Sequence, residues 1–375
     1  MRKGGEKSET VGRLLDSGCN AAFPGCVALV WRAGATRYVG AHGVVATYPG
    51  VPSALATTAT VFDLASLTKV LCTTTLAAMA VGQGKVRLET PVPSDWAAAC
   101  RGATLGDLLE HCAGFRAHRE FFAELRGSAA YPLDLVRRAV ETPAAYGLRQ
   151  RSIYSDLGFI VLGAWLERLW EQGLGPAFRT RIAEPLGVAE SLSFRSVATT
   201  PVPGVAPTEV YDVALHGSTP PSWFGARRHQ PKLNWAQGQV HDDNAFVAGG
   251  TAGHAGLFGT AAAVLEVALA WVDAGRLAGL DAGVQRLFRQ PSTVPASTRR
   301  KGWDGPTLDG SGSTGLSLSP RAFGHLGFTG TSLWVDPIPG DARVYILLSN
   351  RVHPTRANLA IRGFRRAFHG IAAEL

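Results

Sequence analysis

Apolar runs separated by turn-forming residues occur at both ends of the chain, and this pattern is typical of β-strands. Near the start, GCVALVWRAG (25–34) and ATRYVGAHG (35–43) predict two strands joined by a turn at Gly34. Near the end, TSLWVDP (331–337) and RVYILLSN (343–350) predict two more strands around a Pro-Gly turn. Strands at both ends of one chain predict a sheet that is built from both termini.

Between these strands, apolar residues recur at helical spacing. From Ser66 onward, SLTKVLCTTTLAAMAVGQG predicts a helix that ends at Gly82 or Gly84. Further helices are predicted at TLGDLLEHCAG (104–114), YPLDLVRRAVE (131–141), SDLGFIVLGAWLERLWEQG (155–173), TAAAVLEVALAWVDAG (260–275) and HPTRANLAIRGFRRAFHG (353–370). Residues 195–250 are rich in Pro, Gly and His and predict a long irregular loop, which in a compact domain is usually functional.

The order of these elements predicts an α/β fold with one mixed sheet. Residues 20–65 and 255–375 are expected to form the sheet region. The mostly helical region 66–254 is inserted between them, and a polar segment, 1–19, precedes the sheet. The sequence contains no internal repeat.

Composition and charge indicate an ordinary globular protein. The chain has 375 residues, of which 46% are hydrophobic and 18% charged, with a net charge of +8. The densest basic cluster, Arg362, Arg365 and Arg366, favours a solvated helix face over a footprint for nucleic acid or anionic lipid. We therefore expect neither nucleic acid nor a membrane as partner, and the oligomeric state stays open.

Targeting features and cysteines favour a cytoplasmic location. The first ten residues, MRKGGEKSET, are polar and are not followed by the apolar core of a signal peptide. The longest apolar stretch, 257–272, contains Glu266 and is too short to span a bilayer. Five cysteines without a C-x-x-C pair argue against a disulfide framework or a zinc site.

Ser66 and Lys69 form the single S-x-x-K pair in the chain, which places both on one face of a helix. Only six lysines stand against 31 arginines, so a site that needed only positive charge would more often carry arginine. Lysine can lose its proton when desolvated, and serine needs a base to act as a nucleophile. The helix start would also offer a backbone N–H for an oxyanion. The alternative is a surface serine near a surface lysine.

Two later segments could complete such a site. SIYSDLGF offers Tyr154, whose pKa a nearby cationic lysine could lower, and Asp156 two positions on. FGHLGFTGTSLWVDP offers His325 between glycines, directly before a strand. Taken singly, Tyr154 is also interpretable as a residue that flanks a helix, Asp156 as a helix cap and His325 as a structural histidine.

Other motifs give weaker hypotheses. GSGSTG (310–315) matches a dinucleotide-binding pattern but neither follows a strand nor opens a helix. The run HDD (241–243) lacks the spacing of a metal site. His111 and His254 are interpreted as hydrogen-bonded turn residues. No serine lies in a G-x-S-x-G elbow, which argues against an α/β-hydrolase triad.

Together, S-L-T-K (66–69), Y-S-D (154–156) and H-L-G (325–327) occur in an order that resembles the serine β-lactamase and penicillin-binding protein superfamily. The chain most resembles the class C β-lactamase-like branch, which includes esterases and D-peptidases. PGCVALVWRAG, LLEHCAGF and AGHAGLFGTA agree, so the resemblance spans roughly residues 20–370. It implies a mixed α/β sandwich with an antiparallel sheet flanked by helices and an inserted helical region, and no metal or cofactor.

The resemblance also implies roles for individual residues. Ser66 would be the acylated nucleophile, and Lys69 and Tyr154 the proton-transfer pair. The backbone N–H groups of Ser66 and Phe328 would form the oxyanion hole.

Substrate-binding roles are implied for Asp156, His325 and Gly327, but this chain departs from the family pattern there. Asp156 stands where an Asn is usual and would repel an anionic substrate. Leu326 replaces a hydroxyl residue, and His325 replaces a permanent cation with a group mostly neutral at pH 7.

These departures favour a cytoplasmic serine hydrolase that acts on a small ester or amide, with weak activity on β-lactams or D-peptides. A penicillin-binding or ligand-binding sensor that acylates with little turnover is the alternative. A nucleotide-binding protein is a more distant one.

Overall fold

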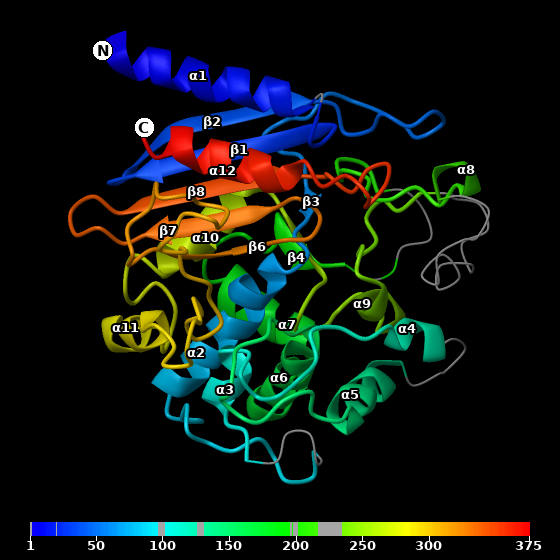
Figure 1. Ribbon diagram of the computed structural model, residues 1–375, viewed down its shortest axis with the longest axis vertical. Coiled ribbons are helices and arrows are strands. Elements are labelled where there is room, and N and C mark those ends of the chain that lie inside the picture. Colours follow the sequence, from blue (N-terminus) through cyan, green and yellow to red (C-terminus); the bar gives the residue numbers. More distant parts are fainter. Residues whose placement is uncertain are drawn as a thin grey trace.

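Two antiparallel sheets and a set of helices make up the protein (Figure 1). The computed structural model describes residues 2–19, 21–96, 102–125, 131–195, 197, 202–216 and 235–375. The larger sheet consists of β1 Gly25–Arg32, β2 Ala35–Gly43, β6 Phe323–Leu326, β7 Ser332–Asp336 and β8 Arg343–Ser349. Its strand order is β2-β1-β8-β7-β6. N-terminal β1 therefore pairs with C-terminal β8, and the predicted sheet built from both termini is confirmed.

Both faces of the central strands of the larger sheet are buried, whereas the edge strand β2 is largely exposed. In β1, Cys26, Ala28 and Val30 pack with the terminal helices, whereas Val27 and Leu29 belong to the main core on the other side. Side chains alternate across a strand, so a strand buried on both faces has apolar residues at consecutive positions. This explains the unbroken run CVALVW in the sequence.

Helices cover the sheet and form the rest of the molecule (Figure 1). On one face lie α1 Arg2–Cys19 and α12 Ile361–Ala372, and α10 Ala261–Ala270 packs against β1 and β8 from the other. The remaining helices are η1 Lys69–Thr74 and η3 Arg179–Ala183, both π-helical, and α2 Thr75–Gly82, α3 Leu105–Leu109, α4 Phe121–Glu124, α5 Tyr131–Glu141, α6 Asp156–Trp170, α7 Leu174–Phe178, α8 Val213–His216, α9 Asp243–Val247 and α11 Ala282–Arg289. None of the described helices is long and apolar enough to cross a bilayer.

A small second sheet links the two regions near the site. Its strands are β3 Phe62–Asp63, β4 Leu192–Phe194 and β5 Leu257–Gly259, in the order β3-β5-β4. Since β3 ends three residues before Ser66, this sheet fixes where the first turn of the helical region begins.

Several local predictions differ from the structure. The polar pattern of 1–19 predicts no element, whereas α1 lies there and is anchored by few apolar residues, among them the fully buried Val11 and Leu15. The segment 104–114 contains only the short α3, after which His111 has a left-handed φ of 57°. His325 lies within β6 and does not merely precede a strand.

The region 195–250 is less irregular than its composition predicts. It contains the short helices α8 and α9, and α9 begins at an N-cap formed by Asp242. Residues 196, 198–201 and 217–234 of the predicted loop lie outside the described residues.

Candidate active site

Ser66 lies in a tight turn between β3 and the helical region. Ala65, just before it, has a φ of 47°, in the left-handed region that residues with side chains rarely adopt. The Ala65 N–H donates to the Asp63 carboxylate over 2.8 Å, which holds this turn in place. Strained backbone of this kind concentrates at functional sites. The Ser66 side chain lines a cavity of about 600 Å³.

Lys69 is fully buried and donates to three acceptors around its Nζ atom. These are Ser66 Oγ at 3.1 Å, Asp156 Oδ1 at 2.7 Å and the His254 carbonyl at 3.0 Å. An ammonium group has three N–H donors, which the acceptors around Nζ share. The π-helical η1 begins at Lys69, and π-helical turns often mark functional positions.

The Lys69 ammonium is stabilised by its neighbours. Burial would lower the pKa of Lys69, but Asp156 and then Tyr154 outweigh burial, so the pKa lies above its ordinary value. Lys69 is therefore protonated in the resting site, and Ser66 Oγ accepts a hydrogen bond from it. The sequence predicts the pairing of these two residues, but not the charge state that Asp156 imposes.

Tyr154 completes the group around Ser66. Hydrogen bonding to Lys69 and to Ser66 acts to lower the pKa of its hydroxyl. The Lys69 Nζ lies 4.9 Å from the centre of the tyrosine ring, and the His325 ring centre lies 5.6 Å from it. Burial raises the pKa of Tyr154 although Lys69 acts to lower it. Lys69 thus acts on this pKa in the expected direction, but desolvation is the larger effect and the net pKa lies above its ordinary value.

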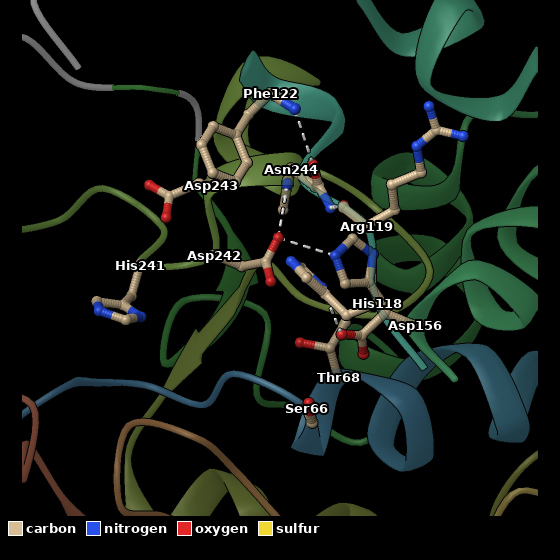
Figure 2. A network of polar contacts seen from close by, with 12 residues as sticks. Ser66, Thr68, His118, Arg119, Phe122, Asp156, His241, Asp242, Asp243 and Asn244 are labelled. Carbon is tan, nitrogen blue, oxygen red and sulfur yellow. Dashed lines mark hydrogen bonds and ion pairs between the residues drawn. The ribbon is translucent and has the colours of Figure 1, made fainter. Parts of the chain in front are cut away.

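Asp156 is the first residue of α6, after the N-cap Ser155. One oxygen of its carboxylate accepts from Lys69. The other lies 3.3 Å from the His118 Nδ1 atom (Figure 2). Burial would raise the pKa of Asp156, but Lys69 and His118 hold it well below its usual range. Asp156 is therefore ionised and paired with the Lys69 ammonium. The predicted repulsion of an anionic substrate is accordingly offset, because the negative charge is neutralised within the site.

A histidine–aspartate pair, His254 and Asp242, lies next to Lys69. No sequence motif predicts this pair as part of the site. His254, whose carbonyl accepts from Lys69, has its Nε2 atom 2.8 Å from Asp242 Oδ1. The same Asp242 oxygen accepts from the Ala245 N–H at the start of α9. Figure 2 shows Asp156, His118 and Asp242 gathered on one side of Ser66. No motif marks His118 and Asp242 as site residues, since only the fold brings His118 to Asp156 and Asp242 to His254.

His325 contributes a neutral imidazole ring beside the Tyr154 ring. Its Nδ1 donates to the Leu326 carbonyl over 2.8 Å, which leaves Nε2 as an acceptor. This Nε2 is buried and has no hydrogen-bond partner among the described residues. Burial, with Lys69 and Arg299 adding to it, lowers the pKa of His325 to about 3, so the ring is neutral at pH 7.

The turn after β6 lies against the segment that carries Ser66. Thr331 Oγ1 donates to the Leu64 carbonyl over 3.0 Å, and Thr329 Oγ1 donates to the Asp63 carbonyl over 2.7 Å. A Cβ atom on Gly327 would lie 2.6 Å from the Leu64 carbonyl oxygen and 1.9 Å from Thr331 Oγ1, so only glycine fits there. The structure thus brings Gly327 beside Ser66, as the motif order predicts.

The cavity has a charged lining with opposite signs on different elements. The acidic residues that line it are Glu120, Asp156, Asp242, Asp243 and Asp304, and the arginines are Arg299, Arg351, Arg356, Arg362 and Arg365. All seven residues named in the sequence as site candidates lie together, six of them lining the cavity and Lys69 buried beneath it. The pattern GSGSTG is separate: none of its residues lines the cavity.

Comparison with known proteins identifies the family. The family model named Beta-lactamase matches residues 11–367. The chain belongs to the beta-lactamase family. It is accordingly a serine hydrolase of the beta-lactamase fold, and the resemblance seen in the motifs is confirmed.

Curated relatives and solved structures agree with membership of the beta-lactamase family. A Salmonella gallinarum protein, provisionally named a D-alanyl-D-alanine carboxypeptidase, is 30% identical over 332 residues, which cover 81% of this chain and 72% of the relative. EstCE1, described as a hydrolase with promiscuous acyltransferase activity, matches with a TM-score of 0.71 and 20% identity over 99% of this chain and 100% of its own. A penicillin-binding protein homologue from Caulobacter crescentus gives 0.68 and 16% over 98% and 97%. These two structures show the same fold.

Proposed function

We propose that this chain hydrolyses a small ester or amide through an acyl-enzyme on Ser66. The observation that carries the proposal is the shared contact of Lys69 and Tyr154 with the Ser66 side chain, at the wall of a cavity large enough for a small substrate. A serine needs such a base to become a nucleophile. The order of the three motifs supports the class C β-lactamase-like branch as the part of the family nearest to this chain.

In the proposed mechanism, Ser66 Oγ attacks the substrate carbonyl while its proton passes to the Lys69–Tyr154 pair. The pair can accept this proton only after it has lost one, because Lys69 is an ammonium and Tyr154 a neutral phenol at rest. The tetrahedral oxyanion is stabilised by the N–H groups of Ser66 and Phe328. Neither N–H donates a hydrogen bond to another part of the described chain. The intermediate then collapses: the bond to the alcohol or amine breaks, and this group leaves with the proton that the pair took from Ser66. Water next attacks the acyl-enzyme, the pair returns a proton to Ser66, and the acyl group leaves as the acid.

The substrate is proposed to be an ester or amide rather than a β-lactam that is rapidly hydrolysed. His325 is neutral and Leu326 has no hydroxyl, so the two positions that would bind a substrate carboxylate in the family offer no charge and no O–H donor. Asp156 and Gly327 are proposed to shape the acyl side of the cavity, since both line it next to Ser66.

A reducing compartment such as the cytoplasm is proposed as the place of action. Cys26, Cys72 and Cys112 are buried free thiols, and burial raises the pKa of each. Thiols in this state are poorly reactive, which suits a chain that does not depend on disulfides.

The alternative function is a sensor that is acylated with little turnover. The observation that favours it is the ion pair between Lys69 and Asp156, since a protonated Lys69 cannot take a proton from the deacylating water. Such a site would acylate slowly and retain the acyl group.

One labelling experiment distinguishes the two functions. The protein is mixed with p-nitrophenyl acetate and, separately, with a fluorescent penicillin, and the peptide containing Ser66 is followed by mass spectrometry. We expect continuous release of nitrophenol with little acetyl group retained. Label that stays on Ser66 for many minutes without product release would favour the sensor. Wild-type protein that gives neither label nor product would contradict both.

Replacement of Asp156 by asparagine is expected to move the acidic limb of the pH–rate profile to lower pH. Asp156 raises the pKa of Lys69, whereas burial lowers it, so without the carboxylate burial dominates and Lys69 loses its proton at lower pH. A shift of about one pH unit or more is expected from the loss of an opposite charge at this distance. The profile of kcat/KM for an ester measures it.

Asp95→Asn is the matched control for this change, because Asp95 forms an exposed ion pair with Arg168. Its profile should stay at the wild-type position. An acidic limb that does not move in the Asp156→Asn protein, or that moves to higher pH, would show that Asp156 does not control the base.

A further inference from the structure

The turn that carries the Phe328 N–H is bound by a buried arginine, Arg365, which also lines the cavity. One guanidinium nitrogen of Arg365, on α12, donates to the Gly327 carbonyl over 2.6 Å and to the Thr331 carbonyl over 2.7 Å. The Gly327 N–H donates to the same Thr331 carbonyl over 2.7 Å, and the Gly330 N–H donates to the Gly327 carbonyl over 3.1 Å. Arg365 therefore bridges both ends of the turn 327–331.

Arg365 is an unusual side chain for this place. It is 7% exposed, and no ion pair joins it to a carboxylate in the described part of the chain. Burial lowers the pKa of Arg365 to about 9, and the nearby Arg351 adds to the effect, yet the group remains charged at pH 7. A buried cation without an anion is unfavourable unless it is hydrogen-bonded. The carbonyl groups of the turn therefore stabilise the charge of Arg365. In return, Arg365 stabilises the position of these carbonyl groups.

The geometry of one peptide group connects Arg365 to the reaction. The Gly327 carbonyl and the Phe328 N–H belong to the same peptide unit, and in a trans peptide the C=O and N–H bonds point in opposite directions. Arg365 and the Gly330 N–H hold the oxygen on the side of α12. The N–H of the same unit is then directed away from α12.

We propose that Arg365 is a positioning residue for the oxyanion hole: it holds the Gly327–Phe328 peptide and polarises its N–H. A hydrogen bond from a charged donor is about twice as strong as a neutral one, and hydrogen bonds that share a group strengthen one another. Positive charge on the carbonyl oxygen side makes the N–H a better donor to the developing oxyanion. The inference rests on the proposed role of Ser66 and Phe328.

Arg351 holds the next peptide in the same way. Its Nε donates to the Phe328 carbonyl over 2.7 Å, its guanidinium lies 4.3 Å from the Phe328 ring centre, and its own N–H donates to the Thr329 carbonyl over 2.8 Å. The two arginines therefore fix the peptide units on both sides of Phe328. Arg365 is the one that touches the unit whose N–H is proposed to bind the oxyanion.

The test compares Arg365→Met and Arg365→Lys with wild type in acylation by p-nitrophenyl acetate. We expect kcat to fall on the order of 10- to 100-fold with little change in KM, because the N–H matters only when the oxyanion forms; outright loss of an oxyanion donor costs about 10²–10³. The ester carbonyl stretch of the acyl-enzyme, made with ¹³C-labelled substrate, should move to higher wavenumber, since a weaker donor polarises the carbonyl less. Arg365→Lys should be intermediate in both readouts.

Arg366→Met is the matched control. Arg366 lies on the same helix and also donates to backbone carbonyls, those of Ser311 and Gly312, but it is exposed and does not line the cavity. It should retain wild-type kcat and carbonyl frequency. If Arg365→Met does not fold by circular dichroism, Arg365→Lys, which keeps the charge and most of the packing, provides the comparison.

The outcomes separate the two proposals. If wild type is acylated on Ser66 and Arg365→Met and Arg365→Lys both keep the wild-type kcat and carbonyl frequency, the role of Arg365 is wrong while the proposed function stands. A fall in stability without a change in the carbonyl frequency would also overturn it, since that result describes a structural residue. If wild type is not acylated on Ser66 at all, the proposed function itself has failed.

Discussion

Replacement of Ser66 by alanine is expected to abolish the hydrolysis of p-nitrophenyl esters. Removing the nucleophile from a site of this type lowers kcat by about 10⁴-fold or more, because binding and the oxyanion hole alone accelerate the reaction only weakly. The change deletes one acceptor of Lys69 but leaves Asp156 and the His254 carbonyl in place. The loss of one hydrogen bond costs about 1–3 kcal/mol, so the protein should remain folded.

Ester turnover, mass-spectrometric labelling and thermal unfolding measure this together. Ser17→Ala is a suitable control, because Ser17 is exposed on α1 and bonds only to the Leu14 carbonyl of its own helix. The control should keep full activity and labelling. Turnover at the wild-type rate in the Ser66→Ala protein would eliminate the acyl-enzyme mechanism, and label on another residue would place the nucleophile elsewhere.

The architecture could be predicted from the sequence because its signals are local. Strands such as β1 and β8 are continuous apolar runs, and α6 has both an apolar face and the N-cap Ser155. The helix α1 escaped prediction because a helix that covers one sheet face needs few apolar residues when most of it is exposed. The sequence does not predict β6 because the strand is short. Its four residues include Gly324 and His325 and show little of the pattern typical of a strand.

The centre of the candidate site could also be predicted, since Ser66, Lys69, Tyr154 and His325 lie in recognisable motifs. Its electrostatics could not. The charge on Lys69 depends on Asp156, and the low pKa of Asp156 depends in turn on Lys69 and His118. These groups come from three separate segments, and the sign of each shift is decided by burial against charge. A sequence shows which groups can titrate, whereas only their packing shows which effect is larger.

Lys69→Arg is expected to be inactive although it keeps the positive charge. The Nζ atom of Lys69 donates to three acceptors on different elements, a geometry that suits a tetrahedral ammonium and not a planar guanidinium. Arginine also cannot give up its proton in the accessible pH range, so it cannot join Tyr154 in taking the proton of Ser66. General-base catalysis contributes about 10²–10⁴-fold, and a loss of this size in acylation is expected.

Lys69 is an ammonium at rest. The Lys69→Arg variant therefore tests whether Lys69 gives up a proton and acts as a base during the reaction or contributes only its positive charge. If Lys69 acts as part of the base, wild-type acylation rises with pH as the pair loses a proton, whereas Lys69→Arg stays inactive up to pH 10. If Lys69 acts only through its charge, with Tyr154 as the base, arginine can replace it and turnover stays near normal. Lys301→Arg is the control for the effect of a lysine-to-arginine exchange as such. Lys301 forms an ion pair with Glu110 and does not line the cavity. Single-turnover acylation across pH 6–10 separates the two cases, since only the first requires a proton to leave Nζ.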